Sequence, residues 1–490
     1  MSVTPIGWVI IPVSLIFFFV APRFLVPWAI AVSVLQAASV FNVSGAFPIG
    51  ITPYFFVTIL ICLRFVPQWL SGRLGFGFDE YVRLYLRFLL LLVIWGLLSA
   101  STLPVLFKNT PVDTPRAGMD AAFSSPLHWT WSNGAQAGYL VLLCVFIIYI
   151  LWQSVDRLQV ERCIAAFRWS GAFAAGLGAY QLLAHATGLP YPASFFNSNL
   201  AWAQLFNQRT DSAWRVSATF TEPSAAGAFF ATWTTLMLFS VIGDERARWS
   251  QWCLLAGGIV ILAVTTSTTG YLVGATVITL FFGRQLLQVL VRGALRRKAL
   301  VALVIVIAAL AAGMLLLPDF SRVIRDVILY KSQSKSGRDR MATSVHGFQL
   351  LVQTLGLGVG LGSNRPSGLL SYIASNLGIP GLLLFLYLLY ITRVMTVAAS
   401  AAAANAGAAS RIRACGWVFA ASLLAAFAAG AEVTSPILWV SWGILLAACR
   451  HAFVTAPQPA LDDAIAPDQA FSAQSPSEPA FLVNTIPWST

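Results

Sequence analysis

Charged residues are scarce in this sequence. Only 10% of its 490 residues are Asp, Glu, Lys or Arg, whereas 58% are hydrophobic, and the mean hydropathy is +0.77. Soluble chains usually carry about 25% charged residues, so this composition excludes an ordinary soluble protein. Apolar runs long enough to cross a bilayer as helices recur along the chain. The composition therefore indicates an all-α polytopic membrane protein.

The signatures of several chemistries are also missing. The six cysteines form no CxxC pair and no Cys/His cluster with metal-ligand spacing, which argues against a zinc site. There is no GxSxG nucleophile motif. The run GLGVGLGS around Gly358 lacks the GKS or GKT ending of a phosphate loop, so we expect its glycines to permit a tight bend or close helix packing. We expect neither a metal nor another cofactor.

Nucleic acid is not an expected partner. The formal net charge is +12, but most Arg residues lie in short clusters between apolar runs and do not alternate with aromatic residues. Such clusters are typical of the cytoplasmic loops of membrane proteins. The net charge is therefore mostly a signal of membrane topology.

Thirteen segments approach the length of about 20 apolar residues that a membrane-spanning helix needs. The first two are separated only by Pro22 and Arg23, so we expect a bundle of 12–13 transmembrane helices. The segments are residues 6–21, 24–42, 49–68, 86–105, 135–154, 165–184, 224–242, 250–266, 269–287, 299–317, 368–392, 412–431 and 436–454.

The charges of the loops predict the orientation of these spans. Arg-rich loops alternate with sparser loops, and short positively charged loops normally face the cytoplasm. This assigns the C-terminus to the cytoplasm. The N-terminus is expected outside if there are thirteen spans and inside if there are twelve. The first apolar run lacks a basic region before it, so no cleavable signal peptide is expected.

One transmembrane domain is expected over residues 1–455, followed by a disordered cytoplasmic tail at 456–490. Three outer loops are long enough to carry short amphipathic helices: residues 106–134, 185–223 and 318–367. The third holds seven basic and three acidic residues, a net charge of +4 on the side that the positive-inside rule disfavours. This charge suggests that the loop holds an anion.

Arg215 and Glu222 lie at the end of the second long loop, in WRVSATFTEPS, directly before a predicted span. Ionisable residues at the rim of a membrane cavity are candidates for function. Both residues also have a simpler interpretation. Glu222 would cap the helix that begins near Pro223, and Arg215 would extend to the membrane interface.

A second group of candidates lies in residues 338–355, which predict an amphipathic helix carrying Arg338, Arg340 and His346. Guanidinium groups match phosphate geometry, and His exchanges protons near neutral pH. A solvated polar face is the simpler interpretation of the same pattern. Arg365 closes the glycine turn on the outer side, where it would hold an anion or contact lipid headgroups. The acidic residues of the outer loops lack the DD or DxD spacing of a divalent-cation site, so arginine would have to neutralise any bound phosphate.

Three features, in this order, resemble the O-antigen ligase/polymerase family of bacterial membrane proteins. They are an Arg before a span that opens with EPS, the Arg-led segment GRDRMATSVHGFQLL in a long late outer loop, and a GxGxG turn followed by SYIASNLGIPG. The resemblance covers roughly residues 200–395 specifically, and the remainder of the chain only in its hydropathy.

The resemblance implies a metal-independent glycosyltransferase of the bacterial inner membrane, whose site faces the periplasm and whose substrates are sugar chains on undecaprenyl diphosphate. The family's phosphate-binding arginines match Arg215 and one of Arg338 or Arg340. Ligases of the family carry a His, and then an acidic residue, about where this chain has Ser367 and Asn376 or Leu377. This departure favours a polymerase of O-antigen, capsule or exopolysaccharide repeat units over a ligase that transfers polymer to the lipid A core.

A transporter of lipid-linked oligosaccharides and a non-catalytic assembly scaffold are also compatible with the sequence. Partners implied by the resemblance are a flippase and a chain-length regulator, besides membrane lipids and the lipid-linked substrates themselves. The expected site has diphosphate-binding arginines and two candidates for accepting the proton of a sugar hydroxyl. The arginines are Arg215, Arg338, Arg340 and Arg365, and the proton acceptors are Glu222 and His346.

Overall fold

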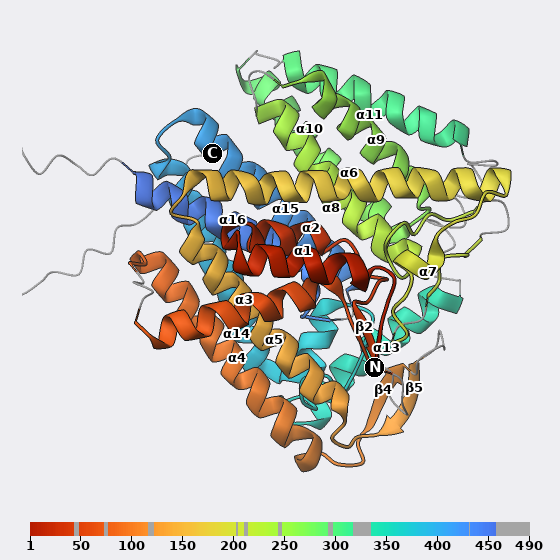
Figure 1. Cartoon of the computed structure of the whole chain (residues 1–490), viewed down its shortest axis with the longest axis vertical. Helices are drawn as coiled ribbons and strands as arrows, with labels where there is room; N and C mark the ends of the chain where they lie inside the picture. Colours follow the sequence, from red (N-terminus) through yellow and green to blue (C-terminus); the bar gives the residue numbers. More distant parts are fainter. Residues whose placement is uncertain are drawn as a thin grey trace, which may run out of the picture. The chain divides into compact units, whose positions relative to one another are not determined.

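The computed structural model describes residues 1–43, 49–72, 77–115, 122–201, 204–209, 214–243, 247–292, 297–316, 335–430 and 432–456. Over these residues the chain is an all-α polytopic membrane protein, with small antiparallel sheets in its loops (Figure 1). Eight of the described helices are long and apolar enough to cross a bilayer. The expected disordered tail lies outside the described residues from residue 457 onward.

Each of the thirteen predicted segments contains a helix. Two further helices, α7 (Ala193–Phe196) and α13 (Lys335–Gln353), lie in the long outer loops, and α13 confirms the helix predicted at 338–355. The helices of the thirteen segments are α1 (Gly7–Phe19), α2 (Leu25–Val32), α3 (Pro53–Leu70), α4 (Glu80–Leu106), α5 (Trp131–Gln153), α6 (Arg157–Thr187), α8 (Pro223–Gly243), α9 (Trp249–Val264), α10 (Thr268–Arg292), α11 (Arg297–Leu316), α14 (Leu369–Ala402), α15 (Ala406–Ala429) and α16 (Pro436–Thr455).

The second predicted span departs from a regular helix. A short 3-10 turn (Pro22–Phe24) leads into α2, which ends at Val32, and residues 33–40 continue as buried irregular backbone. Non-helical backbone is tolerated at membrane depth only where protein or a cavity provides its hydrogen-bond partners. Here the distant Thr219 does so: its hydroxyl donates to the Val34 carbonyl at 2.6 Å, and its carbonyl accepts from the Ala37 N–H at 3.0 Å.

The N-terminus lies on the same side as the predicted outer loops. Strand β1 (Ser2–Val3) pairs with β2 (Phe41–Val43), which pairs with β3 (Ile49–Ile51), all antiparallel. Asn42 of β2 donates to the carbonyl of Ser198, a residue of the second long outer loop, at 2.7 Å. This arrangement agrees with the thirteen-span alternative, in which the N-terminus is outside.

Contacts at the two ends of the bundle agree with the predicted alternation of loops. At the predicted cytoplasmic end, Arg64 donates to the Phe18 carbonyl at 3.0 Å, and Arg411 lies 3.5 Å from Glu161. The predicted outer loops contact one another at the other end. At the centre of the bundle is α16, whose Trp439 and Trp442 are fully buried against neighbouring helices.

The glycine-rich turn fills a break in α14. Gly378 has φ +66° and ψ −165°, so the helix is interrupted there. The turn packs into the break: Val359 N–H donates to the Ser375 carbonyl at 2.7 Å, and Ile379 N–H donates to the Gly356 carbonyl at 2.7 Å. A Cβ on Gly358 would lie 2.8 Å from the Gly378 nitrogen. This close approach confirms the expectation that the glycines permit a bend and close packing.

The first long outer loop contains an antiparallel hairpin that sequence analysis did not predict. Its strands are β4 (Pro111–Pro115) and β5 (Ala122–Pro126). The hairpin is attached to the glycine turn, because the Arg365 N–H donates to the Asp113 carbonyl at 3.0 Å and the Asp113 N–H donates to the Asn364 side chain at 2.9 Å. Segments from two outer loops, far apart in sequence, thereby form one unit.

Candidate functional site

Arg215 is held in a fixed position just before α8. Its Nε donates to the Thr266 hydroxyl at 3.0 Å, its Nη2 to the Thr266 carbonyl at 3.3 Å, and its Nη1 to the Gln208 side chain at 2.9 Å. Thr266 lies in the turn between α9 and α10, so the guanidinium connects two outer turns. These bonds use three of the five N–H groups that an arginine offers.

Glu222 and Arg340 bring the charged end of α13 to the start of α8. Arg340 Nη2 lies 3.9 Å from Glu222 Oε1, and the Ser224 hydroxyl donates to the same carboxylate. Burial lowers the pKa of Arg215, the Glu222 carboxylate raises it, and the neighbouring Arg340 lowers it. The guanidinium remains cationic at neutral pH. Two arginines from different loops therefore lie near one carboxylate, and Arg340 is the one at ion-pair distance.

Arg365 also has an acidic partner, which sequence analysis did not place in the site. The Arg365 side chain forms an ion pair with Glu432, in the short turn between α15 and α16. Glu432 is a single acidic residue in a short turn and belongs to no sequence motif. The only signal in the sequence was its place in a predicted outer loop. The pair joins the end of the third long loop to the last outer turn.

A cavity of about 240 Å³ lies between the start of α8 and the last outer turn. Glu222, Arg365 and Glu432 are among its lining residues, at its outer rim. Its wall follows α8 from Ser224 to Thr232, eight residues or about 12 Å at 1.5 Å per residue. The cavity therefore extends from the charged rim into the membrane-spanning part of the bundle.

The irregular second span forms part of the cavity wall. Ser33, Leu35 and Gln36 line the cavity directly after α2 ends. The interruption of the second span thus lies at the cavity. Interrupted helices are common at binding sites inside membrane bundles.

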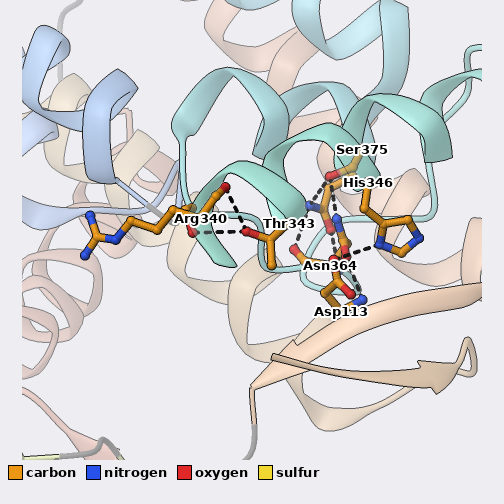
Figure 2. A network of polar contacts seen from close by, with 8 residues as sticks. Asp113, Arg340, Thr343, His346, Asn364 and Ser375 are labelled. Carbon is orange, nitrogen blue, oxygen red and sulfur yellow. Dashed lines mark hydrogen bonds and ion pairs between the residues drawn. The ribbon is translucent and has the colours of Figure 1, made fainter. Parts of the chain in front are cut away.

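His346 lies on a different side of α13 from Arg340. Figure 2 shows the two side chains extending in opposite directions, with His346 directed toward the hairpin. Its Nδ1 lies 2.7 Å from Asp113 Oδ2, and it is not among the residues that line the cavity. The role of His346 as proton acceptor remains a prediction, and its contact is with the residues that attach β4 to the glycine turn.

Arg338 is exposed at the start of α13, whereas Arg340 is partly buried beside Glu222. The helix therefore distinguishes between the two arginines that the sequence left equivalent. Met341, Val345 and Phe348 are also exposed, at 68%, 47% and 43%. Together they form an apolar stripe of the kind that interfacial helices present to lipid.

The charged residues near the cavity form two groups, Arg215, Glu222 and Arg340 in one and Arg365 and Glu432 in the other, and Glu222, Arg365 and Glu432 line the cavity itself. Arg215, Arg340 and Arg365 carry three positive charges, and Glu222 and Glu432 carry two negative charges. The net positive charge suits a phosphate group, and the cavity beside it is uncharged below the rim. Among the residues that the structure describes, no cluster of three or more His, Cys, Asp or Glu side chains could hold a metal ion.

A second cavity, also of about 240 Å³, lies on the other side of α8, between α8, α9, α10 and α11. Its lining is almost entirely apolar, and Tyr271, Leu262 and Ala263 bring it to within two turns of Thr266, the partner of Arg215. Arg215, whose guanidinium group makes three hydrogen bonds, therefore lies close to the outer end of this apolar cavity.

Comparison with known proteins does not assign the chain to a family. No protein-family model matches it, and no curated protein matches it. The resemblance to the O-antigen ligase/polymerase family therefore stays a prediction that depends on the residues themselves.

Proposed function

We propose that this protein is a glycosyltransferase of the bacterial inner membrane. It polymerises oligosaccharide repeat units carried on undecaprenyl diphosphate into O-antigen, capsule or exopolysaccharide at the periplasmic face. The C-terminus is cytoplasmic, and a flippase and a chain-length regulator act beside it. The observation that supports this proposal best is the position of Arg215 and Arg340 near Glu222, which lines a cavity that Arg365 also lines.

We assign the roles in the proposed reaction from the charges of the side chains. Arg215 and Arg340 bind the diphosphate and stabilise the negative charge that grows on it as it leaves. A hydroxyl oxygen of the incoming sugar forms a bond to the anomeric carbon, and the bond from that carbon to the diphosphate oxygen breaks. The electron pair leaves with the diphosphate, and Glu222 accepts the hydroxyl proton. Glu222 is preferred to His346 because it lines the cavity.

The apolar cavity beside α9 and α10 supports a lipid-linked substrate. A diphosphate at Arg215 would lie close to its outer end, and an isoprenoid chain is apolar along its whole length. A soluble sugar nucleotide would have no use for such a cavity.

The residues that depart from the ligase pattern have structural roles here, which supports a polymerase. Asn376 accepts hydrogen bonds from the backbone N–H groups of Ser363 and Asn364, at 3.0 and 2.9 Å. Ser367 lies 3.1 Å from the Thr343 hydroxyl. Asn376 thus stabilises the glycine turn through its side-chain amide. This is a structural role, which differs from the role expected of the acidic residue near this position in ligases of the family.

Broken helices often bind ions or substrates in transporters, and the interrupted second span, which lines the cavity, is the feature that would favour a transporter. The break in α14, however, is filled by protein. The Asn376 carbonyl, which has no helical donor because residue 380 is proline, accepts from the Gly360 N–H at 3.0 Å, and the Leu377 carbonyl accepts from the Trp95 ring N–H at 2.7 Å. The geometry of α14 therefore supports a structural break.

The test is polymer formation in a deletion strain complemented with wild type, Arg215→Ala or Glu222→Gln. Each variant should reach the membrane at the normal level yet leave single repeat units, with at least about a 100-fold loss of polymer. The control is Arg157→Ala, which removes an exposed arginine of the predicted cytoplasmic end that pairs only with Glu161 among the contacts described. Polymer of normal length and amount from Arg215→Ala would refute the proposal, and polymer that accumulates on its lipid carrier without reaching lipid A would favour a ligase.

A further inference from the structure

A single residue in a strained conformation, Thr266, connects α9 to α10. Thr265 is the C-cap residue of α9, and the Ser267 hydroxyl accepts from the Gly270 N–H in the first turn of α10 at 3.2 Å. Between them, Thr266 has φ +47°, in the left-handed region that glycine usually occupies directly after a helix. A β-branched residue is rare in this region. Such strain persists where the surrounding structure enforces it, and it is concentrated at functional sites.

The strained residue presents two oxygen atoms to one guanidinium group. Its hydroxyl accepts from Arg215 Nε at 3.0 Å, and its carbonyl accepts from Arg215 Nη2 at 3.3 Å. Glycine, the ordinary residue at this position, would offer only the carbonyl. The side chain of Thr266, which is 1% exposed as a residue, therefore gives Arg215 an additional and buried hydrogen-bond acceptor.

The turn that carries Thr266 is fixed against α8, the helix that follows Glu222. A Cβ on Gly227, in the second turn of α8, would lie 2.3 Å from the Cβ and 2.5 Å from the Oγ of Ser267. The turn and the helix are therefore in direct contact, with no room for a side chain between them. Through this contact the turn fixes the guanidinium of Arg215 relative to the helix that begins beside Glu222.

Gln208 provides a second support for Arg215. Its side-chain oxygen accepts from Nη1 at 2.9 Å, and its backbone carbonyl accepts from the Arg215 N–H at 3.1 Å. Each terminal nitrogen of the guanidinium keeps one further N–H that has no acceptor among the described residues. Two such N–H groups on one guanidinium can bind two oxygens of a phosphate or a diphosphate.

We infer that Thr266 is a positioning residue for the proposed transfer. Its hydroxyl and carbonyl orient Arg215 so that the remaining N–H groups bind the leaving diphosphate. This inference rests on the proposed function, because it concerns how the same site holds its arginine. Without the hydroxyl, the guanidinium would keep its charge but lose its single orientation. Transfer should be sensitive to this loss, since a misplacement of about 1 Å can lower a rate about 100-fold.

The experiment measures initial rates of sugar transfer by the purified full-length protein in lipid vesicles, with the lipid-linked repeat unit at varied concentration. Thr266→Val keeps the shape of the side chain and removes the acceptor of Arg215 Nε. It should lower kcat about ten- to 100-fold, because the Nε–H loses its partner and the guanidinium is misplaced. The change in KM should be smaller, since the charge that Arg215 stabilises grows in the transition state. Thr266→Ser should retain most of the wild-type kcat, because it keeps the hydroxyl.

Thr265→Val is the matched control, the same substitution one residue earlier in the turn. Thr265 is also fully buried, and its hydroxyl donates to the Leu262 carbonyl at 2.7 Å. It has no described contact with Arg215, so its substitution should leave kcat and KM unchanged. An equal loss of kcat in Thr265→Val or in Thr266→Ser would overturn the inference, because the loss would then come from the packing of the turn.

A second measurement tests whether Thr266 acts through Arg215. Residual transfer by Arg215→Ala is followed at high protein concentration, with and without Thr266→Val. The second substitution should cause no further loss, because the group that the hydroxyl positions is already absent. A further loss as large as the one in the wild-type background would show that Thr266 acts independently of Arg215, and the positioning role would be wrong.

The two proposals fail in distinguishable ways. If Arg215→Ala lowers transfer as proposed while Thr266→Val keeps the wild-type kcat, only the positioning role is wrong. If the wild-type protein transfers no sugar from the lipid-linked repeat unit, the proposed function fails and the positioning role fails with it. Thr266→Ala also removes the hydroxyl and eliminates the β-branch, so it provides the same test if Thr266→Val does not accumulate.

Discussion

Glu222 lies near two arginines that come from different loops. Arg340 lies 3.9 Å from its carboxylate, and Arg215 is close enough for both charges to change its pKa. A partly exposed ion pair at this distance stabilises the fold by only about 0–1 kcal/mol. The arrangement therefore contributes little to stability, which is consistent with the proposed role of these charges in binding a phosphate group.

The two neighbouring arginines of α13 should differ in their importance. Arg340→Ala removes a guanidinium beside Glu222 and should lower polymer formation by about 100-fold, because one charge stabiliser of the leaving group is lost. Arg338→Ala removes an exposed side chain and should have an effect of roughly twofold or less. Polymer yields of the two variants, normalised to their membrane levels, provide the comparison. The interpretation would be wrong if Arg338→Ala caused the larger loss.

At the scale of single elements, the glycine turn and the break in α14 depend on one another. Gly358 has φ +83°, a conformation that residues with a Cβ adopt only at a cost, and its backbone touches that of Gly378. The turn positions Arg365 through Asn364 and the hairpin. A change at Gly358 should therefore affect the rim of the site as well as the packing of α14.

Gly358→Ala should destabilise the protein by about 1–3 kcal/mol from backbone conformation alone, and by more if the neighbouring backbone cannot move. The expected result is a lower melting temperature in detergent and a reduced amount in the membrane. Gly176→Ala in α6 is the matched control, because a Cβ there meets no atom within 4 Å. Equal stability of the two variants would show that the turn accommodates a side chain.

The helices of the protein could be predicted from its sequence, whereas the contacts between its outer loops could not. Apolar length predicted a helix in all thirteen segments, and the amphipathic pattern predicted α13 within a few residues. The rotation of α13 could not be predicted, because it depends on the β4–β5 hairpin, which contacts His346 through Asp113. Glu432 was equally hidden, since its importance comes only from its proximity to Arg365 in the folded chain.

At the scale of the whole molecule, the pairing of β1 with β2 has a topological consequence. It brings Ser2 to the side where residues of the second long loop contact the sheet. If the N-terminus is on the outer side and the chain crosses the membrane thirteen times, an odd number, then the C-terminus lies on the opposite face. The number of crossings can therefore be tested by locating the N-terminus.

In a variant without the native cysteines, Ser2→Cys should react with a membrane-impermeant maleimide added to intact spheroplasts. Ala404→Cys, in the exposed turn between α14 and α15, should react only after the membrane is permeabilised. Both positions are exposed in the structure, so accessibility depends on the membrane and not on folding. Labelling of Ala404→Cys alone in intact spheroplasts would contradict the thirteen-crossing arrangement.

The interrupted second span has a consequence for biosynthesis. The backbone of residues 34–37 obtains hydrogen bonds from Thr219, which is synthesised about 180 residues later. At about 5–20 residues per second, the ribosome needs on the order of ten seconds or more to reach it. In the folded protein the helix of this segment has only eight residues, too short to cross the bilayer alone. We therefore expect the N-terminal part of the protein to complete its insertion only after the start of α8 has been synthesised.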